Sequence, residues 1–141
     1  MEKIKKAYYY FFYKIYKSIE YTSELVGGAF WTDFKAGLVI LTFELWIIGS
    51  FLNYYSVIND QKLDIYIISP ILLFFLTIFS IINYFAFMHN DIWKKYNEDF
   101  DKLPKKENQK GTIVVWMIAV FIILNFFGSA FLLQKYVLKM Y

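Results

Sequence analysis

The chain has 141 residues, enough for a single domain, and 59% of them are apolar, above the roughly 45–50% of soluble domains. Its net charge of +3 is too small to indicate nucleic-acid binding, and its 15 basic residues are all lysine, which lacks the guanidinium fork used in tight phosphate recognition. The sequence contains no cysteine, which excludes disulfides, thiolate metal sites and cysteine nucleophiles.

The first predicted element is an amphipathic helix within residues 1–30, and it is unusually aromatic. Residues 6–21, KAYYYFFYKIYKSIEY, hold six tyrosines and two phenylalanines among three lysines. Residues three and four positions apart share a helix face, so this helix has one polar and one apolar face. The polar face carries Lys3, Lys6, Tyr10, Tyr13, Lys14, Lys17, Tyr21 and Glu24, and the apolar face carries Ile4, Tyr8, Phe11, Phe12, Ile15 and Ile19.

This composition is typical of a helix in the headgroup layer of a bilayer, because a tyrosine ring favours hydrocarbon and its hydroxyl favours water. We therefore expect the helix to lie at the membrane interface and to end at Gly27 and Gly28. The residues expected at the interface are Lys3, Lys6, Lys14, Lys17, Trp31 and, in a later segment, Trp93. The alternative is an aromatic helix that packs only on protein.

Three apolar stretches follow, at residues 36–57, 65–88 and 112–133. Each reaches the length of about 20 residues that a helix needs to cross a bilayer. The predicted fold is therefore an all-α integral membrane protein with three transmembrane helices, an interfacial N-terminal helix and a helical stub on the inner side.

The start of the second stretch depends on Pro70. A helix that began near Ile65 would place Pro70 in its second turn, where proline removes a hydrogen bond and kinks the helix. We favour a start with Ser69 as the N-cap and Pro70 as the first helical residue, since both residue types are preferred at those positions. Residues 58–68 would then form an external loop.

The lysines predict the orientation. Twelve of the 15 lie before the first stretch or between the second and third, and three lie in the other two segments. Cytoplasmic segments carry the excess of lysine, so the N-terminus is expected inside and the C-terminus outside a bacterial inner membrane.

Residues 89–111 are expected to form a cytoplasmic amphipathic stub and loop. Ile92, Trp93, Tyr96 and Phe100 share one face of a helix, and Pro104 is expected to stop it. We expect the second transmembrane helix to continue directly into this stub. The acidic residues of the stub would then face the lysines of the N-terminal helix.

Polar residues within the apolar stretches are the candidate site residues. Glu44 is the acid well inside a predicted span, where charges are costly and mark functional candidates. It is expected either to be protonated or to hydrogen-bond to Ser80, Asn83 or Asn125. Its functional interpretation is proton or cation handling, and its structural interpretation, which we favour, is a neutral acid that joins helices. The full set of candidates is Glu44, Asn53, Ser80, Asn83, Asn125 and Ser129.

The sequence contains no motif that indicates catalysis or a cofactor site. The single histidine, His89, has no second ligand three or four residues away, so neither a metal site nor a haem site is expected. Nucleotide-binding and hydrolase motifs are absent from the sequence as well. An enzyme is not expected.

The segments YYYFFYKIYKSIEYTSE and WKKYNEDFDKLPKKENQKG resemble those of small three-span membrane proteins from AT-rich Gram-negative bacteria. The resemblance implies a bacterial inner-membrane protein and no particular chemistry. The expected function is non-catalytic binding of another membrane component, as by an accessory subunit, assembly factor or immunity protein. The alternative is a small homo-oligomeric channel or membrane-disrupting effector, with Glu44 and the polar stripes lining a pore. The expected partners are the lipid bilayer and either a protein partner or further copies of the chain, and nucleic acid is not among them.

Overall fold

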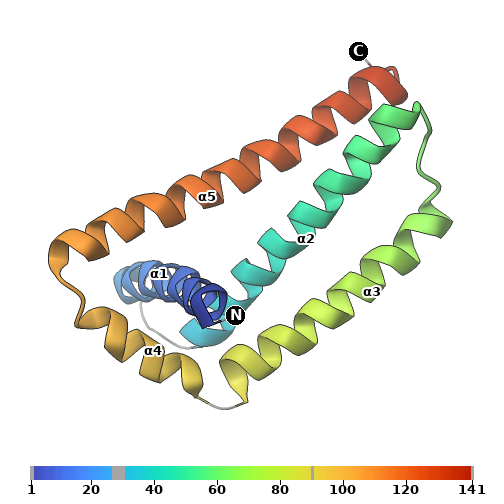
Figure 1. The fold of residues 1–141 in the computed structure, drawn as a ribbon. Coiled ribbons are helices and arrows are strands. Elements are labelled where there is room, and N and C mark those ends of the chain that lie inside the picture. Colours follow the sequence, from blue (N-terminus) through green and yellow to red (C-terminus); the bar gives the residue numbers. More distant parts are fainter. Residues whose placement is uncertain (1, 27–30, 90, 141) are drawn as a thin grey trace.

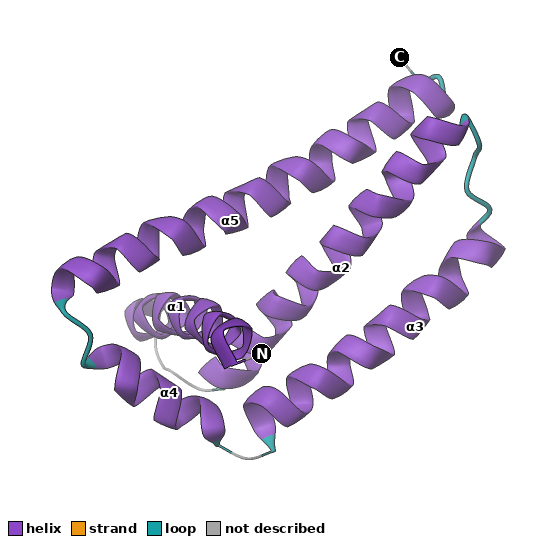
Figure 2. Cartoon of the chain, in the orientation of Figure 1, coloured by secondary structure: helices purple, strands orange, loops and turns teal. Residues whose placement is uncertain are grey.

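A computed structural model describes residues 2–26, 31–89 and 91–140. Within these residues every regular element is helical, as Figure 2 shows. In chain order they are α1 (Glu2–Val26), α2 (Thr32–Asn59), α3 (Ile65–Asn83), the π-helical turn η1 (Tyr84–Met88), α4 (Ile92–Asp101), α5 (Lys105–Leu132) and the π-helical turn η2 (Leu133–Val137). The predicted end of the first helix at Gly27 and Gly28 lies outside the described residues.

Among the described residues, three helical stretches are long and apolar enough to cross a membrane: Thr32–Asn59, Ile65–Met88 and Lys105–Val137. They match the three stretches expected from the sequence, but α5 begins seven residues before the predicted Thr112. The extra turns consist of the polar sequence KKENQKG. Because this run is polar, the sequence predicted it as a loop, but it is helical.

The helix α2 lies between α3 and α5 and packs against both of them (Figure 1). The short α4 connects α3 to α5 at one end of this arrangement. At the same end α1 runs across the direction of the three long helices and contacts α2 and α4. The molecule therefore has a three-helix part and an end at which α1 and α4 gather.

The helix α3 begins earlier than we favoured, so the predicted start at Pro70 is wrong. Asp64 is its N-cap, and the side chain of Asp64 accepts a hydrogen bond from the Tyr66 backbone N–H at 2.9 Å. Pro70 lies inside the helix, where it leaves the Tyr66 carbonyl without its usual helical partner. The cap at Asp64 satisfies the Tyr66 backbone N–H at the start of the helix, and the connection from α2 is residues 60–64, shorter than the predicted 58–68.

The helix α3 does not continue into α4, which corrects the prediction of one continuous helix. The π-helical turn η1 ends at Met88, and Asp91 adopts a left-handed conformation with φ of 47° before α4 starts. An L-residue in this conformation cannot extend a right-handed helix. The break allows α4 to turn toward α1.

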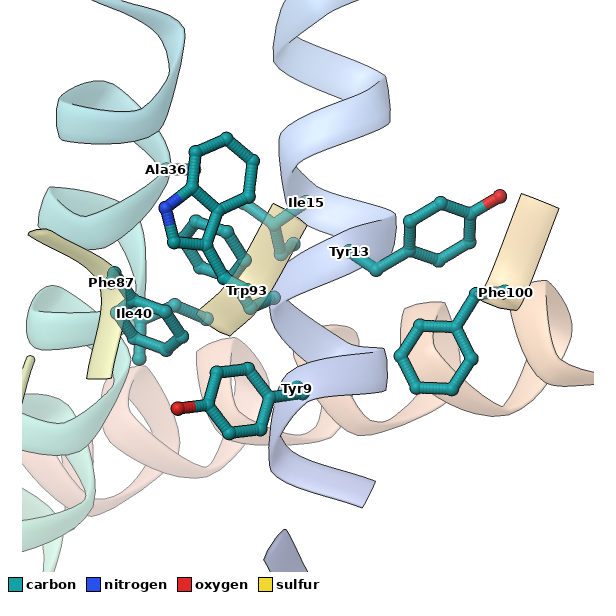
Figure 3. Packing of buried hydrophobic residues seen from close by; sticks show 9 residues of the cluster. Tyr9, Tyr13, Ile15, Ala36, Ile40, Phe87, Trp93 and Phe100 are labelled. Carbon is teal, nitrogen blue, oxygen red and sulfur yellow. The ribbon is translucent and has the colours of Figure 1, made fainter. Parts of the chain in front are cut away.

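An aromatic cluster holds α1, α4 and η1 together, as Figure 3 shows. The rings of Phe12 and Phe87 stack with centroids 3.9 Å apart, and those of Tyr9 and Tyr96 stack at 4.4 Å. Trp93 meets Phe12 edge to face at 5.6 Å. Stacked and edge-to-face pairs of this kind each contribute about 0.5–1.5 kcal/mol beyond the burial of their area.

Two residues expected at the membrane interface or on the polar face belong to this cluster instead. Trp93 of α4 is only 6% exposed, because its ring packs against Phe12 of α1, and Tyr13 of α1 is only 3% exposed, because its ring packs against Phe100 of α4. Ile4, which was expected on the apolar face, is 75% exposed. The other predicted apolar residues of α1 pack in or against the cluster.

Candidate functional site

The candidate site is a hydrogen-bonded group of three side chains from three helices, with Glu44 of α2 at its centre. The Tyr8 hydroxyl of α1 donates to Glu44 Oε1 at 2.8 Å, and Asn83 Nδ2 of α3 donates to Glu44 Oε2 at 2.8 Å. The Tyr8 hydroxyl also lies 3.4 Å from Asn83 Oδ1. Both carboxyl oxygens of Glu44 therefore have a donor within the chain, one of them Asn83, which is among the partners considered from the sequence.

Local structure fixes these two donors. Asn83 is the last residue of α3 and is buried, and its amide also donates to the Phe79 carbonyl one turn earlier, which holds its orientation. The ring of Tyr8 stacks on Phe87 of η1 with centroids 5.5 Å apart. Burial is the largest cause that raises the pKa of the Tyr8 hydroxyl well above its usual value, and the hydrogen bond to Glu44 is the second. This group therefore remains protonated and a donor.

A groove of about 640 Å³ opens beside Glu44. Its apolar walls are Ile4 of α1 and Phe79 and Ile82 of α3, and Tyr8 and Glu44 add the hydrogen-bonded polar group to its lining. Glu2 and Lys5, both exposed, complete the lining at the start of α1. This volume lies within the range of about 300–1,000 Å³ that small-molecule sites occupy.

The other predicted site residues pair within the chain at the interface of α2 and α5. Asn53 Nδ2 donates to Ser129 Oγ at 3.1 Å, and the Tyr54 hydroxyl donates to Asn125 Oδ1 at 2.8 Å. Neither pair is part of the Glu44 group. Their contacts are those of polar residues that join membrane helices.

Ser80 lies apart from these pairs, in a cavity of about 200 Å³ between α2 and α3. Gly37 and Leu38 of α2 line the same cavity. Gly37 is buried, but a Cβ atom at this position would meet no other atom within 4 Å, so the cavity has room for a side chain here.

The predicted interfacial lysines fall into two groups. Lys3 and Lys6 are exposed, whereas Lys14 donates a hydrogen bond to Asn108 of α5 and Lys17 lies 3.4 Å from Asp101 of α4. Burial lowers the pKa of Lys14, although the charge of Asp101 opposes that effect. Two of the four lysines thus face protein, and the Lys17–Asp101 pair joins the two segments that the sequence suggested would face each other. Trp31, at the start of α2, is 58% exposed.

Sequence reasoning missed Tyr8 as the partner of Glu44 and missed the contact of Tyr10 with α5. The Tyr10 hydroxyl donates to Asn108 Oδ1 at 3.0 Å and lies against Gly111, where any Cβ would overlap the tyrosine hydroxyl and ring. The position of Tyr8 on the apolar face indicated that its side chain is packed, but not against which helix. No signal marked Asn108 or Gly111, which lie in a polar run.

Among the described residues, no group of three or more histidine, aspartate or glutamate side chains has the arrangement of a metal site. Comparison with known proteins gives no relative: no family model, curated protein or solved structure matches this chain.

Proposed function

We propose that this protein is a non-catalytic component of a bacterial inner membrane that binds another membrane protein. In this proposal α2, α3 and α5 cross the bilayer, and α1 and α4 lie together at its cytoplasmic side. The lysine distribution supports that orientation, since the twelve lysines of α1, α4 and the adjoining helix starts belong to one end of the molecule. The remaining three belong to the opposite end.

The observation that carries the proposal is the open packing of α3. No residue in the most apolar part of α3 is buried, although α3 is the most apolar of the three long helices. The cavity at Gly37 and Ser80 lies along the same helix and leaves room for a side chain of a second helix. Small residues at such positions allow membrane helices to approach closely.

The internal pairing of polar side chains favours a binding protein over a pore. Glu44 has donors on both carboxyl oxygens, and Asn53 and Asn125 bond across the interface of α2 and α5. A conduction path would need polar groups that face water rather than one another. We therefore expect no selective current when the purified protein is placed in planar bilayers. A reproducible cation current that Glu44→Gln abolishes would overturn the proposal in favour of a channel.

Site-specific photo-crosslinking in the native membrane tests the proposed docking surface. A photoreactive residue at position 38, beside the cavity, should give one defined protein adduct, and one at position 121 on the exposed face of α5 should not. Gly37→Leu should abolish the adduct because leucine fills the cavity. The control is Gly128→Leu, since Gly128 is also a helical glycine with open space around its Cβ position. Equal adducts from both positions, or an adduct that survives Gly37→Leu, would refute this docking surface.

A further inference from the structure

The groove beside Glu44 combines an apolar wall with two charges of opposite sign. Ile4 of α1 and Phe79 and Ile82 of α3 form the wall. Glu2 and Lys5 lie three residues apart on α1, where they share a face. Lys3 and Lys6 are not among the lining residues. The groove thus presents one exposed anion and one exposed cation above a hydrocarbon surface.

These two charges, Glu2 and Lys5, have no ion-pair partner among the described residues. Glu44, which lines the same groove, already accepts hydrogen bonds from Tyr8 and Asn83. The groups left to recognise a ligand are therefore one carboxylate and one ammonium.

We propose that the groove binds an aminophospholipid, with one acyl chain along Phe79 and Ile82, the phosphate beside Lys5 and the primary ammonium beside Glu2. A zwitterionic headgroup with N–H donors satisfies both charges, whereas an anionic headgroup leaves Glu2 without a partner. A quaternary ammonium offers Glu2 no hydrogen bond. The groove is lined in part by α1, which gathers with α4 at the end of the molecule proposed above to lie at the cytoplasmic side of the bilayer. The inference rests on that membrane location but not on the protein partner.

The test compares three lipids with identical acyl chains on delipidated protein in detergent, by native mass spectrometry. Phosphatidylethanolamine should bind more tightly than phosphatidylcholine, which lacks N–H donors, and more tightly than phosphatidylglycerol, which lacks the ammonium. Lys5→Gln should weaken binding of all three by about fivefold, which is the scale of one lysine's attraction to an anionic lipid surface. Glu2→Gln should remove the preference for phosphatidylethanolamine and leave phosphatidylglycerol binding unchanged or stronger.

Two matched substitutions on α3 test the acyl chain. Ile82→Trp should fill the groove and abolish binding of every lipid, while Ile81→Trp, on an adjacent exposed residue outside the groove, should not. Equal affinity for the three lipids, a preference for phosphatidylglycerol, or unchanged binding by the Ile82→Trp variant would each overturn the inference. If lipid selectivity fails while the photo-adduct from position 38 persists, the lipid inference falls and the proposed function stands.

Discussion

The hydrogen bonds of Glu44 join α1 to two of the long helices, and their energy can be measured by a double-mutant cycle. Tyr8→Phe removes only the hydroxyl that donates to Glu44, and Glu44→Leu removes both acceptor oxygens. Glu44→Gln keeps one carbonyl acceptor and replaces the other by an amide group. These changes leave the stacking of the Tyr8 ring on Phe87 in place.

The expected magnitudes follow from the number of bonds lost. Hydrogen bonds between membrane helices average about 0.6 kcal/mol and reach about 1.7 kcal/mol. Tyr8→Phe and Glu44→Gln each lose one bond of 2.8 Å and should lower the free energy of unfolding by about 0.6–1.7 kcal/mol. Glu44→Leu loses both bonds and should cost about twice as much. The double variant Tyr8→Phe/Glu44→Leu should cost no more than Glu44→Leu alone, because the shared bond is already absent.

The assay is reversible unfolding by sodium dodecyl sulfate in mixed micelles, followed by circular dichroism. Tyr54→Phe provides the control, since it removes a bond of the same length to Asn125 at a position ten residues along α2 from Glu44. That distance is about 15 Å along the helix, so Tyr54→Phe and Glu44→Leu should be additive within about 0.5 kcal/mol. Additivity of Tyr8→Phe and Glu44→Leu would refute the idea that this bond holds α1 to α2.

Three further predictions concern packing, ionisation and topology. Gly111→Ala should lower stability relative to Gly128→Ala by about 1–3 kcal/mol in the same assay, because only the first alanine overlaps a side chain, that of Tyr10; equal stabilities would contradict the packing of Tyr10. Burial is the main cause that raises the pKa of five α1 tyrosines (positions 8, 9, 10, 13 and 16), so their folded-state pKa values exceed the unfolded value of about 10. Their contribution to stability is complete below pH 10 and should be lost as pH rises through the raised values, with tyrosinate absorbance and release of α1 appearing together; release without ionisation would contradict it. A reporter enzyme that works only outside the cytoplasm should be active when fused to the C-terminus. Activity of a reporter that works only in the cytoplasm would contradict the proposed orientation.

The long apolar helices could be predicted from the sequence because each corresponds to a long stretch of apolar residues. Their starts could not, since α5 begins in the polar run KKENQKG and α3 begins at the Asp64 cap despite Pro70. The placement of α1 was harder still. A tyrosine or tryptophan side chain has the same apolar body and polar tip whether it lies in headgroups or against other rings, so Tyr13 and Trp93 gave no sign of their burial.

The candidate site could be predicted only in part from the sequence. Glu44 and Asn83 stand out as polar residues in apolar runs, and an interhelical bond between them was one of the options considered. The periodicity of the N-terminal segment predicted the helix face on which Tyr8 lies, but not the helix that Tyr8 contacts. The contact of Tyr10 with Asn108 and Gly111 depends on the turn of α4, which in turn depends on the left-handed Asp91. A single backbone conformation of this kind leaves no periodic trace in a sequence.

The docking of α1 has a consequence for the biogenesis of the protein. Tyr10 bonds to Asn108, 98 residues later, and Tyr13 bonds to Asp101, 88 residues later. During synthesis α1 is made before α4 and the start of α5, which supply the partners of Tyr10 and Tyr13. Until α4 and the start of α5 have been translated, only α2 and α3 are available to pack against the rings of α1. The nascent chain then carries an aromatic helix that lacks part of its final binding surface.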